Sequence, residues 1–209
     1  IYTQAKTNPK RVVFADADNY NVLRAAEVCL HEGIAEPILL GRKDKIEKLI
    51  KDYQLDDLIE NAMIIDPVTI EERSRRQRYA KYFHEKRNRK GVRYRDANEK
   101  MYNRNYFGAM MIEHGEADAF ITGYATKYSE AIKPILEVIR CTDKVDHIAG
   151  MYVVMSKKRP MFFADTTINI NPDAKSLVET TLTVTRTIKW LGEQPVVSLL
   201  SYSNFGSTD

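Results

Sequence analysis

Three polar segments of the chain, each directly after an apolar run, carry residue types that bind phosphate groups. The first begins after "AFI" with Thr122 and Gly123 and continues through Lys127 to Lys133. Backbone N–H groups at the start of a helix bind anions, and a nearby ammonium group adds positive charge. We therefore expect Thr122, Gly123, Lys127 and Lys133 to line a site for a phosphate-bearing ligand.

The other two segments supply further hydroxyl, amide and backbone donors. One follows "MFFA" and contains Asp165, Thr166 and Asn169. The other is a small, donor-rich loop near the end of the sequence that contains Ser201, Ser203, Asn204, Gly206 and Ser207. An ordinary polar loop would explain any one of these segments, but three in one chain favour a phosphate-bearing ligand.

The sequence does not favour metal or nucleotide chemistry of the common kinds. Asp16 and Asp18 are the only closely paired carboxylates at the end of a predicted strand; they could bind a metal, but we expect them to be solvated. The four histidines lack the spacing of metal ligands. The GxGxxG, GxxxxGKS/T and GxSxG motifs are missing. We therefore predict no metal site in this chain.

Residues 73–95 form a strongly basic stretch, with eleven Lys and Arg against a single acid, Glu85. Four aromatic residues lie among the charges, and we expect them to anchor a helix whose charges mostly face solvent. No DNA- or RNA-binding motif accompanies the stretch, so no nucleic-acid partner is predicted. Arg87, with Arg89 and Lys90 beside it, is predicted to contribute to a cleft for an anionic ligand.

Apolar runs alternate with amphipathic helical segments over much of the chain. Strands are predicted at 11–16, 37–41, 62–66 and 118–123. Such alternation implies parallel strands joined by crossover helices, and hence an α/β fold. Further along, "IAGMYVVMS" and "PMFFAD" predict a hairpin, and "PVVSLLSYS" predicts a last strand.

Two helix starts are predicted from capping residues. Thr69 and Glu72 fit the T-x-x-E capping box, so a helix is expected from Thr69 to about Arg89. Asn171 followed by Pro172 fits a helix cap and first position, so a second helix is expected to start there.

Composition bounds the class of protein. The chain has 209 residues, of which 44% are hydrophobic and 29% charged, with a net charge of +3. No apolar run approaches the roughly 18 residues of a membrane span, and no signal-peptide core opens the sequence. Cys29 and Cys141 form no CxxC motif. We expect a globular, cytoplasmic protein without membrane association. Its ending, just past a predicted strand, suggests a piece of a longer protein.

Several motifs, in order from about Lys10 to Ser207, resemble the phosphate acetyl/butyryltransferase family. They are "RKGVRYRDANEKMYNRNYFGAMMIEHGEADAFITG", "MFFADTTININPDA" and "PVVSLLSYSNFGS". Within the family, "RNYFGAMM", "GEADAFITGY" and "LSYSNFGS" look most like the phosphotransacetylase-like C-terminal domain of bacterial NADP-dependent malic enzymes.

The resemblance implies a three-layer α/β/α sandwich with a mostly parallel sheet. This is the isocitrate/isopropylmalate dehydrogenase-like, two-domain transacetylase fold, with a ligand cleft between domains and assembly at least to a homodimer. Residues 1–142 would form the first domain, and residues 143–209 the incomplete start of a second, inserted domain.

The resemblance also implies site residues. Arg87 in "EKRNRKG" matches the arginine of the family's E-L-R-K-x-K-G. Lys133 replaces the arginine of R-P-A-L-Q, Lys127 and Tyr128 replace a Thr-Thr pair, and Thr166 replaces the cysteine of A-D-C. Lysine cannot bind phosphate in the bidentate manner of arginine. A site with these replacements is therefore expected to bind acetyl-CoA or acetyl phosphate but to transfer the acetyl group poorly.

The implied function is therefore an acetyl-CoA-sensing regulatory and dimerisation domain of an NADP-dependent malic enzyme. NADP and a divalent metal would be bound by a part of such an enzyme that this sequence lacks. One alternative is an active phosphate acetyltransferase, which moves acetyl between CoA and phosphate. The other is a dimerisation scaffold that binds no ligand.

Overall fold

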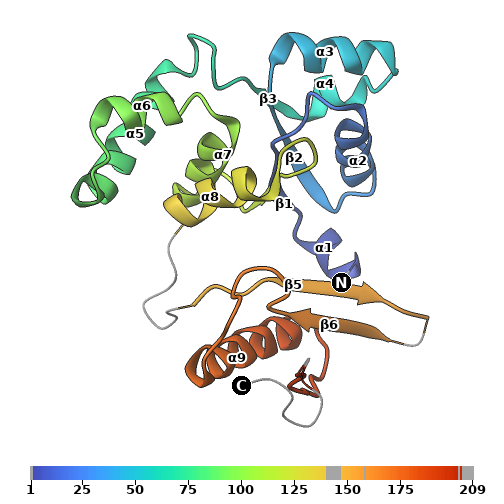
Figure 1. The fold of residues 1–209 in the computed structure, drawn as a ribbon. Helices are drawn as coiled ribbons and strands as arrows, with labels where there is room; N and C mark the ends of the chain where they lie inside the picture. The colour runs from blue at the N-terminus through green and yellow to red at the C-terminus, as the bar shows by residue number, and fades with distance from the viewer. Residues whose placement is uncertain (1, 140–146, 158, 202, 204–209) are drawn as a thin grey trace. The chain divides into compact units, whose positions relative to one another are not determined.

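The structure is a computed structural model that describes residues 2–139, 147–157, 159–201 and 203 (Figure 1). The chain divides into two compact units, Tyr2–Arg140 and Cys141–Asp209, and each is described by itself. The predicted domain boundary after residue 142 falls outside the described residues and remains a prediction. Cys141 also lies outside them.

The first unit contains a four-stranded parallel sheet with the strand order β3-β2-β1-β4. Its strands are β1 (Lys10–Phe14), β2 (Ala35–Leu40), β3 (Met63–Ile65) and β4 (Ala119–Ile121). Its helices are α1 (Tyr2–Thr7), α2 (Tyr20–His31), α3 (Lys43–Asp52), α4 (Asp57–Asn61), α5 (Arg73–Arg87), η1 (Asn88–Lys90), α6 (Tyr94–Lys100), α7 (Arg104–Glu113) and α8 (Tyr128–Val138). The predicted α/β fold with parallel strands is confirmed.

Helices cover both faces of this sheet, because successive strand residues point to opposite sides. Val13 and Leu40 belong to a core that includes Tyr79 and Phe107, from α5 and α7. The neighbouring strand residues pack instead against α2, α3 and α4. Figure 1 shows these two groups of helices on opposite sides of the sheet, so the unit has three layers.

The strand order places a topological switch point between β1 and β4. From β1 the chain passes to β2 and then β3 on one side, and it later returns to β4 on the other side of β1. In open α/β sheets, ligands bind where the carboxyl ends of such strands diverge. The loop after β4, which begins with Thr122 and Gly123, leaves the sheet at this point.

The predicted start of the basic helix at Thr69 is wrong, because α5 begins at Arg73. A turn before the helix takes up the capping groups: the Thr69 hydroxyl donates to the Asp66 carbonyl oxygen at 3.1 Å. The Asp66 carboxylate accepts from the Val68 backbone N–H at 3.0 Å. Glu72 precedes the helix without a side-chain capping bond. The Asp66 turn therefore replaces the predicted capping box.

The second unit contains the predicted hairpin and one long helix. β5 (Met151–Met155) pairs antiparallel with β6 (Pro160–Ala164), and α9 spans Ala174–Trp190. The cap of α9 is Asp173 rather than the predicted Asn171, because the Asp173 carboxylate accepts from the Ser176 backbone N–H at 2.8 Å.

The predicted last strand, "PVVSLLSYS", is wrong for the residues that the structure describes. Residues 195–201 are in no strand, and the side chains of Val196 and Leu200 are 94% and 85% exposed. An apolar run becomes a strand only when a neighbouring strand can complete its hydrogen bonds. Among the described residues, this run pairs with none.

Gly108 allows α7 to approach the sheet, and its replacement tests this packing. A Cβ atom on Gly108 would lie 2.3 Å from Cε2 of Phe120 in β4. We expect Gly108→Ala to lower the free energy of unfolding by about 1–3 kcal/mol, because overpacking outweighs the better helix propensity of alanine. Urea unfolding followed by circular dichroism measures the change. Adding Phe120→Leu should recover part of it; wild-type stability of the single variant would contradict the packing.

Asp118 ties the start of β4 to β1 and makes stability depend on pH. Its Oδ2 accepts from the Arg11 backbone N–H at 2.9 Å and from Arg11 Nε at 3.1 Å. The Arg11 bonds lower the pKa of Asp118 to about 2, below its unfolded value of about 3.9. The carboxylate therefore stabilises the fold above about pH 4, and this contribution is lost as the pH falls towards about 2.

We expect Asp118→Asn to lower the Tm at pH 7, with the difference from wild type closing between about pH 4 and pH 2. Calorimetric melting across this range measures the effect. Asp56→Asn is the matched control, since the exposed Asp56 side chain makes no capping bond to α4. A constant Tm difference across the range would rule out the carboxylate as its source.

Candidate functional site

A buried carboxylate organises the carboxyl ends of β1 and β4. Asp16 is only 2% exposed. Its Oδ2 accepts from the backbone N–H groups of Gly123 at 3.1 Å and Tyr124 at 2.9 Å. The expectation that Asp16 is solvated is therefore wrong, because the loop after β4 folds over it and uses its lone pairs. Asp16 fixes the backbone of the predicted anion-binding segment.

Two residues of α7 complete this polar network. Nε of Arg104 lies 3.8 Å from Oδ1 of Asp16, and the Arg104 guanidinium also donates to Asp18. Oδ1 of Asn105, which is buried, accepts from the Thr122 hydroxyl at 2.7 Å. Thr122 and Gly123 follow β4, as predicted, but the Thr122 hydroxyl and the Gly123 N–H are bonded within the protein, and their role in ligand binding remains a prediction. Arg104 and Asn105 were not predicted, because only the folding of α7 against the sheet brings them to the strand ends.

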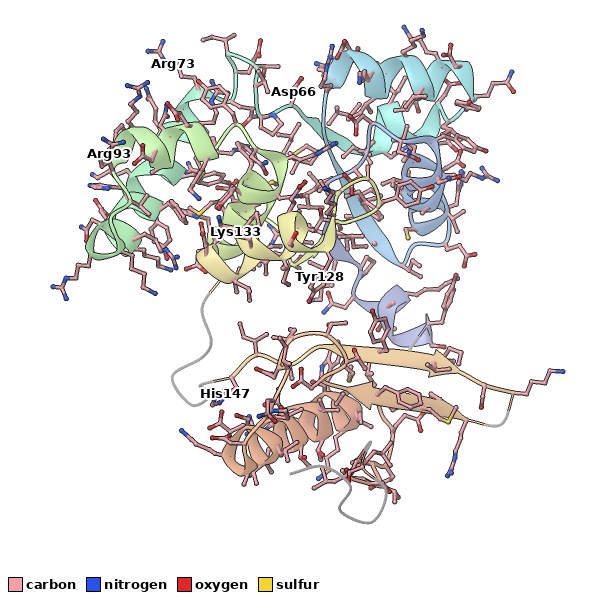
Figure 2. The ribbon with its side chains drawn as sticks, viewed as in Figure 1. Asp66, Arg73, Arg93, Tyr128, Lys133 and His147 are labelled. Atoms are coloured by element: carbon pink, nitrogen blue, oxygen red, sulfur yellow. The ribbon has the colours of Figure 1, made fainter. Side chains whose placement is uncertain are left out.

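The loop after β4 leads into the helix α8. Lys127, just before this helix, and Lys133, within it, are both exposed. Lys127 precedes the helix and provides no side-chain capping bond. Figure 2 labels Tyr128 and Lys133, which lie along this one helix. Pro134 lies inside α8 and is buried. Thus α8 combines a helix start and two cations, the features expected of an anion-binding segment.

Arg87 is the last residue of α5, which packs against α6 and α7. One turn earlier in α5, the Phe83 ring packs edge-on against Tyr106 of α7, with ring centroids 5.7 Å apart. Residues four apart share a helix face, so Arg87 is directed to the same region. Its Nε is enclosed and has no hydrogen-bond partner among the described residues. The guanidinium therefore has an enclosed donor to offer to a ligand.

Arg87, Lys100, Tyr106 and Glu137 form what we call the Arg87 cluster. The Tyr106 hydroxyl donates to Oε2 of Glu137 at 2.6 Å, and Nζ of Lys100 donates to the same oxygen at 2.9 Å. Nζ of Lys100 also contacts the Tyr106 hydroxyl at 2.6 Å and lies 4.3 Å from its ring centroid. The cluster thus joins four helices around one carboxylate.

The pKa shifts in the Arg87 cluster agree with this geometry. Burial raises the pKa of Tyr106, its hydrogen bond to Glu137 raises it further, and the Arg87 charge opposes both. Burial also raises the pKa of Glu137, but the Tyr106 hydroxyl, Lys100 and Arg87 together lower it below its ordinary value. One ionised carboxylate is thus paired with Lys100 and lies within the electrostatic influence of Arg87, and the cluster carries net positive charge.

The expectation that the charges of the basic stretch mostly face solvent holds for seven of its eleven cations, but others serve the fold. Arg76 is only 4% exposed, and its guanidinium donates to the carbonyl oxygens of Pro67 and Thr69. It also lies 4.4 Å from the Tyr102 ring centroid. Ion pairs to Glu116 and Glu113 hold Arg75, Arg78 and Lys86. Helix packing, which a charge count does not reveal, uses these cations.

Arg89 and Lys90, which were predicted to assist Arg87, lie exposed at η1. A cavity of about 450 Å³ at this end of α5 is lined by Tyr82, Glu85, Lys86, Asn88 and Arg89. Arg87 is not among its lining residues. The structure thus directs Arg87 and Arg89 to different surroundings.

In the second unit, one turn after β6 gathers three predicted residues. The Asn169 backbone N–H donates to Oδ1 of Asp165 at 3.2 Å, and its Nδ2 donates to Oδ2 at 2.8 Å. Asp165 has a φ of 51°, a left-handed conformation that aspartate tolerates better than most residues. Thr166 lies between them and is exposed.

The predicted serine loop is described only in part. The Ser203 backbone N–H donates to Oγ of Ser201 at 3.0 Å. Asn204, Gly206 and Ser207 lie outside the described residues, so their predicted role remains a prediction. Among the residues that the structure does describe, no group of three or more His, Cys, Asp or Glu could hold a metal ion. No helix in the same part of the chain is long and apolar enough to cross a membrane.

An α/β unit with a switch-point loop and a cationic cluster defines a class of small-molecule site. The whole chain, residues 1–209, matches the sequence model of a family described as "Phosphate acetyl/butaryl transferase". The chain belongs to this family, and the resemblance drawn from its motifs is confirmed.

Its relatives carry two kinds of name. An NADP-dependent malic enzyme of Escherichia coli (strain K12) is 35% identical over 210 residues, which cover 100% of this chain and 27% of that protein. A phosphate acetyltransferase of Nitratidesulfovibrio vulgaris is 30% identical over 207 residues, which cover 99% of this chain and 29% of that protein. The chain therefore spans less than a third of either relative.

A solved structure supports the fold. The EutD phosphotransacetylase from Staphylococcus aureus matches with a TM-score of 0.83 and 27% sequence identity, over 99% of this chain and 61% of that one. The structure is thus similar to that of a phosphotransacetylase along nearly all of its length.

Substitution of Asp16 tests the structural role of its carboxylate at the switch point. Asp16→Asn removes the charge that faces Arg104 and two backbone N–H groups. We expect it to lower the free energy of unfolding by about 2–4 kcal/mol, because it weakens a buried, charge-assisted network. Urea unfolding measures the change, with Asp18→Asn as the less buried control. Equal losses of unfolding free energy in the two variants would show that the burial of Asp16 does not add to its contribution to stability.

Proposed function

We propose that this chain is a phosphotransacetylase-type domain that binds acetyl-CoA and phosphate and acts as a sensor. In this proposal, the domain belongs to an NADP-dependent malic enzyme and regulates its oxidation of malate. The observation that carries the proposal is the enclosed Nε–H of Arg87, which has no hydrogen-bond partner among the described residues and lies within a cluster of net positive charge. A buried donor without a partner is costly, and a phosphate oxygen would satisfy it with a charge-assisted hydrogen bond.

The residues around the proposed site favour binding over transfer. Lys133 offers a compact point charge where the family resemblance places an arginine, and so lacks a planar two-donor grip. Tyr128 places a large ring where the resemblance places a threonine hydroxyl. Acetyl transfer depends on alignment of the attacking group and on stabilisation of the oxyanion. Reversible binding tolerates looser placement, and the malic-enzyme names among the relatives support a regulatory setting.

The remaining parts of the proposal concern the larger assembly. NADP and a divalent metal would be held by residues outside this chain, in the part that oxidises malate. The domain would assemble at least as a homodimer in the cytoplasm. Acetyl-CoA would then act by binding one state of the assembly more tightly than another, which couples the two sites.

A second candidate is an active phosphate acetyltransferase. Arg87 is kept, and a protein named phosphate acetyltransferase is 30% identical to the chain. In that reaction, the thiolate of CoA attacks the carbonyl carbon of acetyl phosphate. A C–S bond forms, the C–O bond to phosphate breaks, and phosphate leaves. The retained arginine would stabilise the departing phosphate.

Phosphate-dependent release of thiol from acetyl-CoA separates the two candidates when it is measured on the intact protein. We expect release at the buffer background, together with malate oxidation that acetyl-CoA modulates and calorimetric binding of acetyl-CoA. Thiol release well above background would favour the acetyltransferase. Absence of both release and binding would contradict both candidates and favour a scaffold.

Arg87→Ala tests the site itself in the same binding assay. We expect its affinity for acetyl-CoA or phosphate to fall by about tenfold or more, because a charge-assisted hydrogen bond contributes roughly 1.5–3 kcal/mol. Arg95→Ala, a substitution of an exposed arginine in α6, is the matched control and should bind as wild type does. Unchanged affinity in Arg87→Ala would remove Arg87 from the site.

A further inference from the structure

We propose that Glu137 is a built-in counter-anion of the Arg87 site, and that its negative charge keeps the affinity of this site for phosphate low. Glu137 would thus determine which anions the domain retains. The inference rests on the proposed function, since it takes Arg87 as the residue that receives the phosphate group. It adds a specificity-determining residue on α8 that does not itself contact the ligand.

The geometry fixes the Glu137 carboxylate beside the cations. Both of its hydrogen bonds, from the Tyr106 hydroxyl and the Lys100 ammonium, reach the same oxygen, Oε2. Only 18% of the Glu137 side chain and 27% of the Lys100 side chain are exposed. A carboxylate held this way cannot swing away into solvent when an anion arrives. Its charge therefore remains in place during binding.

The Arg87 and Glu137 charges act on each other, although the two side chains form no ion pair among the described residues. The ion pair of Glu137 is formed with Lys100, at 2.9 Å, while Nε of Arg87 has no hydrogen-bond partner among the described residues. The guanidinium donor is thus left for a ligand, but in a field that a nearby carboxylate weakens. Repulsion between Glu137 and a phosphate on Arg87 is only partly screened in this half-buried region.

The repulsion has a consequence for selectivity. A dianion is repelled twice as strongly by Glu137 as a monoanion at the same position, because Coulomb energy scales with charge. Free inorganic phosphate, largely a dianion near pH 7.5, should therefore be held less tightly than Arg87 and Lys100 alone would hold it. A ligand that adds apolar and base contacts to its phosphates, as acetyl-CoA does, can offset the repulsion. The charge of Glu137 would favour acetyl-CoA over free phosphate.

Glu137→Gln removes the charge and keeps the shape. The amide oxygen can still accept from the Tyr106 hydroxyl, so the cluster should keep its packing. We expect inorganic phosphate to bind about three- to tenfold more tightly than to wild type. The affinity for acetyl-CoA should change less. Isothermal titration calorimetry of the intact protein at pH 7.5, with inorganic phosphate and then acetyl-CoA, measures both.

Three variants separate charge from structure. Glu137→Asp keeps the charge and should stay within about twofold of wild-type phosphate affinity. Glu60→Gln makes the same change in net charge on α4, across the sheet from the Arg87 cluster, and should leave phosphate affinity unchanged. In an Arg87→Ala background, Glu137→Gln should lose most of its gain. Melting curves confirm that each variant is folded.

The outcomes distinguish this inference from the proposed function. Unchanged or weaker phosphate binding in Glu137→Gln, with binding still lost in Arg87→Ala, overturns the counter-anion role and leaves Arg87 as the anion ligand. Unchanged binding in Arg87→Ala overturns the site and the role of Glu137 with it. An equal gain in Glu60→Gln also overturns the role of Glu137, because net charge alone would then explain the effect. If Glu137→Gln does not fold, Glu137→Asp still tests the counter-anion role of Glu137. Phosphate binding by Glu137→Asp that is more than about threefold tighter than in wild type would contradict that role, because the charge is kept.

Discussion

The buried carboxylate of Asp16 is the interaction on which the geometry of the first unit depends. It lies at the carboxyl end of the central strand β1 and accepts two backbone N–H groups from the loop after β4. The loop begins the segment that carries Lys127 and α8, so the direction of α8 follows from this contact. Arg104, which belongs to a third element, α7, offsets the cost of burying the Asp16 charge. One acidic side chain thereby links sheet, loop and helix.

Local patterns in the sequence predict much of this architecture, and the errors have a common cause. Strands, crossover helices and the β5–β6 hairpin follow from periodicity and turn residues. The capping box at Thr69 is wrong because the Asp66 turn competes for the same groups. The strand at 195–201 is wrong because strand formation needs a partner elsewhere in the chain. Contacts between distant elements are not encoded in local spacing.

The candidate site shows the same division. Thr122, Gly123 and Lys127 were predictable because they follow a strand directly, and strand ends in α/β sheets carry ligands. Arg104, Lys100 and Glu137 were not, since each lies inside or at the end of a helix. Among eleven basic residues from 73 to 95, a charge count cannot separate Arg76, which holds a turn, from Arg87. The structure distinguishes them, because the Arg76 guanidinium donates to backbone carbonyl oxygens whereas Nε of Arg87 has no hydrogen-bond partner among the described residues.

The residues of α8 connect these observations to function. In the proposed site, Lys133 would hold phosphate less firmly than an arginine because of its geometry, and the carboxylate of Glu137 would weaken binding through its charge. Both features would cost a transferase more than a sensor. Transfer needs the phosphate aligned in the transition state, where misplacement by about 1 Å can lower the rate a hundredfold. A sensor needs only a difference in affinity between two states of the assembly. On the proposed function, the fold would keep its sheet, its switch-point loop and its arginine while the demands on the site relax from catalysis to recognition.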